Sequence, residues 1–108
     1  MSKAKSRGRW VIVGSGDWGL WYGRILATDA EVTKTKSVRL YDARSVRYWY
    51  GRKGGITSLA AYGLCGPRVS ESRIGAPIKS TLVLDVRAIH DCSPGAVAAF
   101  AAFVGHAS

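Results

Sequence analysis

The sequence has few acidic residues, few cysteines and no long apolar run. Only 7 Asp and Glu residues stand against 16 Lys and Arg residues in 108, so the formal net charge at pH 7 is +9. Two cysteines cannot make a disulfide framework, which excludes a disulfide-rich secreted scaffold and favours a reducing, intracellular compartment. No apolar run reaches the roughly 18 residues of a membrane-spanning helix, and the run over residues 10–13 is too short for a signal peptide.

What remains is the composition of a folded, basic protein. The length predicts one domain, and 47% apolar residues with four Trp and five Tyr can form one small core. The strongly basic balance predicts a polyanionic partner, such as nucleic acid or an acidic surface. The alternative is a solvated basic surface that only keeps the protein soluble.

The first nine residues hold four cations and no acid, namely Lys3, Lys5, Arg7 and Arg9. Such an arm is usually mobile until it meets a partner. We therefore expect a basic flexible arm over residues 1–9 and a single α+β domain over residues 10–108.

Residues 10–49 show the patterns of strands and turns. Residues 10–13 and "LWYGRIL" indicate two strands joined by the turn "GSGDWG", and "ATDAEVTKTKS" indicates a polar connection that could extend a strand. "VRLYDARSVRYWY" alternates with period two, which predicts one long strand or two strands with a break near Arg44–Ser45. In that pattern Val38, Leu40 and Asp42 share one face.

The second half of the chain indicates two helices around one strand. "TSLAAYG" predicts a short helix with Thr57 or Ser58 as N-cap and Gly63 at its end, and residues 64–80 are expected to be irregular. "STLVLDVRAIHDC" predicts a central strand. "SPGAVAAFAAFVGH" predicts a helix with Ser93 as N-cap, Pro94 at its first position and Gly105 at its end. Its expected buried face consists of Val97, Phe100, Ala101 and Val104. The predicted fold is a small antiparallel β-sheet or partly open barrel with one short middle helix and one C-terminal helix.

Gly14, Gly16 and Gly19 have GxGxxG spacing, and Asp42 follows at the distance of a ribose-binding acid. A dinucleotide site needs a helix to begin at this motif, but the next residues are Leu, Trp, Tyr and Gly, which form a poor first turn. We interpret the glycines as part of a hairpin turn and predict no cofactor.

Four stretches carry a resemblance to a known family: "WVIVGSGDWGLWYGRIL", "VRLYDARSVRYWYG", "GITSLAAYGL" and "LDVRAIHDCSPGAVAAF". Across Trp10 to about Phe100 the chain resembles small, functionally uncharacterised proteins encoded by tailed bacteriophages and prophages. The most specific part is "DARSVRYWYG" followed by "SLAAYG", with Ser45 where a second Arg is common in the family. The resemblance implies phage origin and a shared fold, and it implies no activity.

His90, Asp91, Cys92 and Ser93 invite a catalytic interpretation, but no orienting group or oxyanion site is visible beside them. We expect Asp91 or Ser93 to cap the last helix and Cys92 to be a small core residue. Cys65, His90, Cys92 and His106 lack the paired spacing of a zinc site, so no metal is predicted.

The basic residues between Val32 and Ser70 are more informative. This stretch contains eight Lys and Arg residues but only one acid, Asp42, and its basic residues are interleaved with aromatic residues. Because Arg suits phosphates and aromatic rings suit unstacked bases, we predict a nucleic-acid-binding face. It consists of Arg39, Arg44, Arg47, Trp49, Arg52 and Lys53, with Lys5, Arg7 and Arg9 of the arm. Alternatives are core packing of Tyr48 and Tyr50, stacking of Arg47 on Trp49, and an ion pair between Asp42 and Arg44.

Trp18, Trp21 and Tyr22 crowd one hairpin, where a small sheet cannot bury them all, so we predict self-association through them. The predicted function is that of a phage-encoded, non-enzymatic accessory protein. It would self-associate and bind nucleic acid with low sequence specificity in the host cytoplasm, without a membrane. The alternatives are a virion component, a factor that binds an acidic host or defence protein, and an anionic nucleotide sponge.

Overall fold

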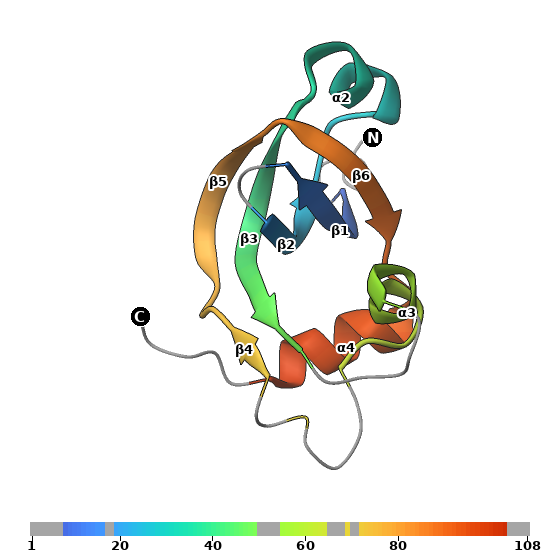
Figure 1. Ribbon diagram of the computed structural model, residues 1–108, viewed down its shortest axis with the longest axis vertical. Helices are drawn as coiled ribbons and strands as arrows, with labels where there is room; N and C mark the ends of the chain where they lie inside the picture. Colours follow the sequence, from blue (N-terminus) through green and yellow to red (C-terminus); the bar gives the residue numbers. More distant parts are fainter. Residues whose placement is uncertain (1–7, 17–18, 50–54, 65–68, 70–71, 104–108) are drawn as a thin grey trace.

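The computed structural model describes residues 8–16, 19–49, 55–64, 69 and 72–103. In these residues the chain forms six strands and three helices (Figure 1). In chain order they are β1 (Arg9–Ser15), β2 (Gly19–Ile25), α2 (Asp29–Thr35), β3 (Ser37–Tyr48), α3 (Gly55–Tyr62), β4 (Arg73–Ile74), β5 (Ile78–Leu84), β6 (Val86–Asp91) and α4 (Pro94–Ala102). The predicted α+β class with an open antiparallel sheet is confirmed.

The sheet has the order β4-β3-β2-β1-β6, and β5 pairs with β3 beside β4. All pairs are antiparallel, with β5 along residues 37–43 of β3 and β4 along residues 46–48. The strands β5 and β6 meet at Asp85 and arch over the β1–β2 hairpin (Figure 1). The Gly16 amide donates to the Asp85 carbonyl at 3.0 Å and the Ser15 hydroxyl donates to the Leu84 carbonyl at 2.7 Å, which fixes this corner against the hairpin.

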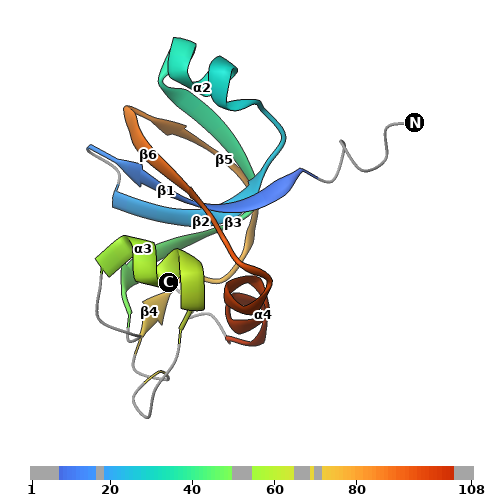
Figure 2. The ribbon, with the colours of Figure 1, turned by 90° about the vertical axis from the view of Figure 1, so that its right-hand side faces the viewer.

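Two hydrophobic clusters lie on opposite sides of the central strands. One cluster fills the concave side, and α2 packs on it through Val32. Its other members are Val11, Val13, Ile25, Val38, Leu40, Ala43 and Val83. The second cluster lies beneath α3 and α4 and consists of Ile12, Tyr22, Val46, Leu59, Ala60, Leu64, Ile74 and Phe100. Figure 2 shows α2 at one end of the strands and α3 with α4 at the other.

The predicted central strand is the largest error. Residues 78–91 form two strands, because Asp85 adopts a left-handed φ of 54° and turns the chain between them. Neither strand is central: β5 pairs only with β3 and β6 pairs only with β1 among the described residues. Part of the region expected to be irregular also forms strand β4 and the start of β5.

The expected polar connection before β3 is in fact helix α2. Thr28 is its N-cap: the Thr28 hydroxyl accepts from the Glu31 amide at 3.2 Å, and the Glu31 carboxylate accepts from the Thr28 amide at 2.7 Å. This reciprocal pair is a capping box, which offsets the weak helix propensity of a segment rich in Thr and Val. Lys36 ends the helix with a left-handed φ of 55°.

The β1–β2 hairpin, the α4 cap and the end of α3 are as predicted. Ser93 accepts from the Ala96 amide at 3.1 Å with Pro94 in the first turn, and Gly63 has a φ of 75° after α3. The start of α3 differs, since the helix begins at Gly55 and therefore contains both expected cap residues. The buried face of α4 also differs. Ala96 and Phe100 are buried, Val97 is half-buried and Ala101 is exposed, whereas Val104 and Gly105 lie outside the described residues.

Strand β3 is a single long strand, but a bulge changes which residues share a face. Asp42 has a left-handed φ of 52°, and the pairing with β2 shifts in register beside it. Val38, Leu40 and Ala43 all enter the concave cluster, so Asp42 does not share their face as predicted. Instead Asp42 is exposed and its side chain meets Arg24. A single extra residue therefore inverts the alternation in the second half of β3.

Candidate nucleic-acid interface

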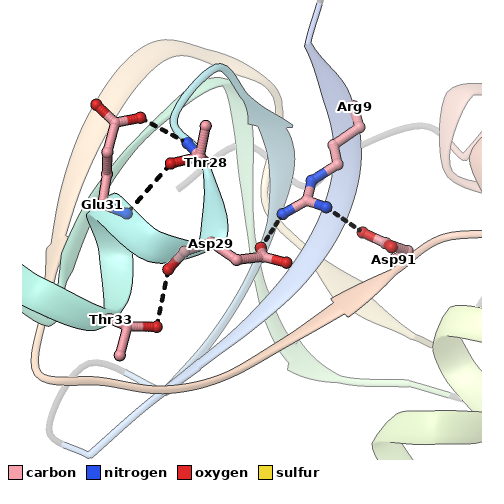
Figure 3. A network of polar contacts seen from close by, with 6 residues as sticks. All are labelled: Arg9, Thr28, Asp29, Glu31, Thr33 and Asp91. Carbon is pink, nitrogen blue, oxygen red and sulfur yellow. Dashed lines mark hydrogen bonds and ion pairs between the residues drawn. The ribbon is translucent and has the colours of Figure 1, made fainter.

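The acidic residues of the described chain are all engaged within the protein. Arg9 bridges Asp29 at the start of α2 and Asp91 at the end of β6, the latter at 3.4 Å (Figure 3). Arg24 pairs with Asp42 at 3.2 Å, and Arg87 pairs with Asp85 at 3.3 Å. The remaining acid, Glu31, is held in the capping box of α2, whose hydrogen bonds from the Thr28 amide and hydroxyl lower the pKa of its carboxyl group.

Many cations have no such partner. Among the described residues, six exposed Lys and Arg side chains make no ion pair, namely Lys34, Lys36, Arg39, Arg47, Arg73 and Lys79. Exposed cations without acidic neighbours create a positive surface potential that attracts polyanions. The charge excess of the sequence is therefore available to a partner at these positions.

Arg9 was predicted to bind nucleic acid as part of the arm, but its guanidinium is occupied by two carboxylates (Figure 3). It ties the first strand to α2 and β6. Its structural role follows from its position as the first residue of β1, where it is part of the sheet.

Arg44 was also predicted to lie on the binding face, and this prediction is wrong because its side chain is only 4% exposed. Its Nε donates to the Gly75 carbonyl at 2.8 Å and its Nη1 donates to the Phe100 carbonyl at 2.5 Å. The guanidinium also lies over the Phe103 ring, 5.7 Å from its centroid. Arg44 therefore joins β3 to β4 and to the end of α4. The proposed ion pair with Asp42 is wrong as well, since Asp42 faces Arg24.

The exposed residues of the predicted face do not share one surface. Arg39 alternates with the buried Val38 and Leu40, whereas Arg47 follows Val46, which belongs to the cluster beneath the helices. Because the Asp42 bulge lies between them, the two arginines point to opposite sides of β3. Arg39 donates to the Ser80 hydroxyl at 3.3 Å on the outer side of β5.

Trp49 does not accompany Arg47 as an exposed aromatic side chain. It is half-buried and packs against the cluster beneath α3 and α4. A second irregularity of β3 lies between Val46 and Tyr48, where the pairing with β4 shifts by one residue. Because of this shift, Arg47 and Trp49 do not lie on the same face of β3, although they are only two residues apart.

The aromatic residue near Arg47 is Trp21 of the neighbouring strand. Trp21 pairs with Ser45 across the β2–β3 ladder, one step from Leu20 and Val46. A hollow of about 430 Å³ lies here, lined by Gly19, Leu20, Trp21, Ser45, Val46 and Arg47. Trp21 also lines a second hollow of about 210 Å³ together with residues 81–84 of β5. The structure thus brings together one exposed cation and one half-buried indole from two strands.

Tyr22 was predicted to contribute to self-association, and this is wrong because its ring is buried. It stacks between Trp10, at 5.1 Å between centroids, and Phe100, at 3.9 Å. Burial raises the pKa of the Tyr22 hydroxyl. Its neighbour Trp21 remains half-buried on the opposite side of β2.

The other members of the predicted sets lie outside the described residues. They are Lys5, Arg7, Trp18, Arg52 and Lys53, and the side chains of Tyr48 and Tyr50 also fall outside the described part. Conversely, sequence reasoning did not single out Arg73 and Lys79, which are exposed. No signal in the sequence distinguishes them from other surface cations.

The remaining candidate motifs have structural roles. The three glycines lie in the β1–β2 hairpin, where only Gly19 has a left-handed φ, of 75°, among those described. Ser93 caps α4, and burial, followed by the nearby Asp91, raises the pKa of the Cys92 thiol to about 12. Within the described residues no three side chains of the kinds that bind metals come together.

Among the residues that the structure describes, no helix is sufficiently long and apolar to cross a membrane.

Fold and surface together define a small α+β protein with an open antiparallel sheet and a basic surface whose charge is largely uncompensated. The chain belongs to a family of unknown function: the family model "Domain of unknown function (DUF6948)" matches residues 8–100. No curated protein and no solved structure matches it.

Proposed function

We propose that the protein binds single-stranded nucleic acid at the hollow beside Trp21 and Arg47. The observation that carries the proposal is the charge pairing. The acids among the described residues are engaged internally, whereas Arg47 is exposed and makes no ion pair there. A guanidinium suits a phosphate, and an indole beside it suits an unstacked base. The remaining exposed cations contact phosphates without reading sequence.

The wider proposal is that of a non-enzymatic, self-associating accessory protein encoded by a phage and acting in the host cytoplasm. The phage origin is supported by the resemblance of "DARSVRYWYG" and "SLAAYG" to phage-encoded proteins. A non-enzymatic role is supported at Cys92, because burial keeps its thiol protonated near neutral pH, and the thiolate is the nucleophilic form.

The test is fluorescence anisotropy of labelled single-stranded DNA, single-stranded RNA and duplex DNA of equal length across a salt series. We expect binding to the single strands to weaken log-linearly with salt concentration. The Arg47→Gln variant should reduce the magnitude of the single-strand salt slope by about 0.7, because one phosphate contact is lost.

Arg87→Gln is the matched control, because it removes the same charge from an exposed arginine that already faces Asp85 at 3.3 Å. Its slope should equal that of the wild type. Absence of binding at low salt, or equal losses in both variants, would contradict the proposal and would assign the basic surface to an acidic protein partner.

The indole is tested separately. Replacement Trp21→Leu should weaken single-strand binding about five- to 150-fold while leaving the salt slope unchanged, because stacking contributes about 1–3 kcal/mol per base and involves no counterion. A slope that falls together with affinity would contradict a stacking role.

A further inference from the structure

We propose that β5 is a dimerisation strand, which pairs edge to edge with the β5 strand of a second copy of this chain. The proposal deepens the self-association within the proposed function and replaces the hairpin aromatic residues as the interface. The two proposals are tested at different residues, because Arg47 lies on β3 and the dimer contacts lie on β5.

The first observation is an unpaired sheet edge that carries a single charged residue, Lys79. Within the described residues β5 pairs with β3 along one side, and no strand pairs with its other side (Figure 1). Edge strands of monomeric proteins are commonly guarded by charges, proline or bulges. The seven residues of β5, IKSTLVL, contain one charged residue, no proline and no left-handed residue.

The second observation is the exposed apolar side chains of this strand. Ile78 is 46% exposed, Leu82 is 49% exposed and Leu84 is 46% exposed, and they are three of the five large apolar residues that are exposed in the described chain. The concentration of exposed apolar side chains on one short edge strand is typical of a surface that another chain covers.

The peptide groups of Ser80 and Leu82 are oriented toward this edge, whereas the Leu84 carbonyl is already hydrogen-bonded within the chain. The Leu84 carbonyl accepts from the Ser15 hydroxyl, which belongs to β1 and not to β3. Peptide groups of a strand alternate in direction, so those of Ser80 and Leu82 point away from β3 like that of Leu84. Four hydrogen bonds can therefore form between two β5 strands through Ser80 and Leu82.

The sequence of β5 is suited to pairing with itself. An antiparallel two-fold pair centred on Thr81 places Ile78 opposite Leu84 and Ser80 opposite Leu82. Such self-complementarity is the requirement of a two-fold dimer. The exposed apolar side chains of both copies then adjoin in one stripe on one face of the paired sheet, and contact between neighbouring strands reduces their exposure to water.

Charge does not oppose this pairing at physiological salt. Lys79 falls opposite Val83, so the two Lys79 side chains are four residues apart along the strands, or roughly 13 Å. This separation exceeds the Debye length of about 8 Å. Because two chains of net charge +9 repel one another at long range, higher salt should strengthen the dimer. Nucleic-acid binding has the opposite salt dependence.

The test is sedimentation equilibrium of nucleic-acid-free protein over a concentration series at low and high salt. The wild type should be a dimer whose dissociation constant falls as salt rises. Leu82→Lys should raise that constant at least about tenfold, because two leucines leave each interface and two cations enter it. Leu26→Lys is the matched control, since Leu26 is 44% exposed and lies outside β5.

Hydrogen exchange of the wild type provides a second readout that does not depend on a variant folding. Protection of the Ser80 and Leu82 amides should increase with protein concentration, whereas that of exposed amides in α2 should not. A monomer at every concentration, a dimer insensitive to Leu82→Lys, or unchanged protection in β5 would each overturn the proposal. Because Arg47→Gln should leave the dimer intact, failure of dimerisation and failure of nucleic-acid binding are distinguishable.

Discussion

The guanidinium of Arg44 donates a hydrogen bond to the Phe100 carbonyl, and this contact joins the long central strand to the last turn of α4. The last carbonyls of a helix have no intrahelical donor, and they carry the negative end of the helix dipole. The Phe100 carbonyl also accepts from the Phe103 amide at 3.2 Å, so the guanidinium is a second donor there, and its positive charge stabilises the helix end. In this position Arg44 serves the fold, although its neighbours in sequence suggested a role at the surface.

Replacement of Arg44 should therefore be costly. Arg44→Ala should lower the free energy of unfolding by about 2–4 kcal/mol, because it removes two hydrogen bonds and leaves a cavity. Arg44→Met should cost less, since it preserves most of the volume. Arg47→Ala, on the same strand but exposed, should stay within about 0.5 kcal/mol of the wild type. Urea unfolding measures all three, and equal losses at positions 44 and 47 would contradict the structural role.

Substitutions at two glycines with the same backbone conformation can distinguish the cost of backbone strain from the cost of steric overlap. Gly63 and Gly19 both have a φ of 75°. A Cβ atom at position 63 would lie 2.8 Å from the Ala96 Cα, whereas at position 19 no atom lies within 4 Å. Gly19→Ala should cost roughly 1–2 kcal/mol for its left-handed backbone. Gly63→Ala should cost about 1–3 kcal/mol more, because α3 and α4 must separate.

Thermal and urea unfolding of the two variants test this difference. If Gly63→Ala and Gly19→Ala unfold at the same denaturant concentration, the close approach of α3 to α4 does not limit stability. The substitution Ala99→Gly removes the Ala99 Cβ, which would lie 3.0 Å from a Cβ at position 63. Combined with Gly63→Ala, it should therefore recover part of the lost stability.

The features that were predicted correctly are those determined by residues adjacent in the sequence. The turn after β1, the Ser93 cap with Pro94, and Gly63 at the end of α3 each depend on a few adjacent residues. The missed helix α2 also had a local signal, since Thr28 and Glu31 have the spacing of a capping box. Its Thr and Val residues suggested a strand, and the cap outweighed that propensity.

The candidate site was harder to predict, because it depends on contacts between distant residues. Arg47 was identified correctly as an exposed cation, but its aromatic neighbour is Trp21, which only strand pairing brings near. The bulge at Asp42 separates Arg39 from Arg47, and periodicity cannot show such an inserted residue. The burial of Arg44 depends on Gly75 and Phe100, which are remote in sequence.

The bulge itself can be tested at Asp42. Asp tolerates a left-handed backbone better than a β-branched residue, so Asp42→Val should destabilise the protein by about 1–2 kcal/mol or more. Asp42→Asn preserves this tolerance and removes only the exposed ion pair with Arg24, so its effect should be below about 1 kcal/mol. Denaturant titrations in which Asn is as harmful as Val would show that the charge, and not the backbone, decides this position.

The buried thiol of Cys92 makes stability depend on alkaline pH. Burial raises its pKa to about 12 in the folded protein, whereas an unfolded thiol titrates near pH 8.5. Above the unfolded pKa the unfolded chain binds fewer protons than the folded chain, so stability falls as pH rises from about 9 toward 12. In a Cys65→Ser background, the further change Cys92→Ala should flatten the thiol-dependent part of this decline.

The Cys65→Ser variant should react slowly with a thiol reagent when folded and rapidly in denaturant. Fast reaction of the folded protein at neutral pH would mean that Cys92 is accessible as a thiolate, and it would reopen the case for a nucleophilic role.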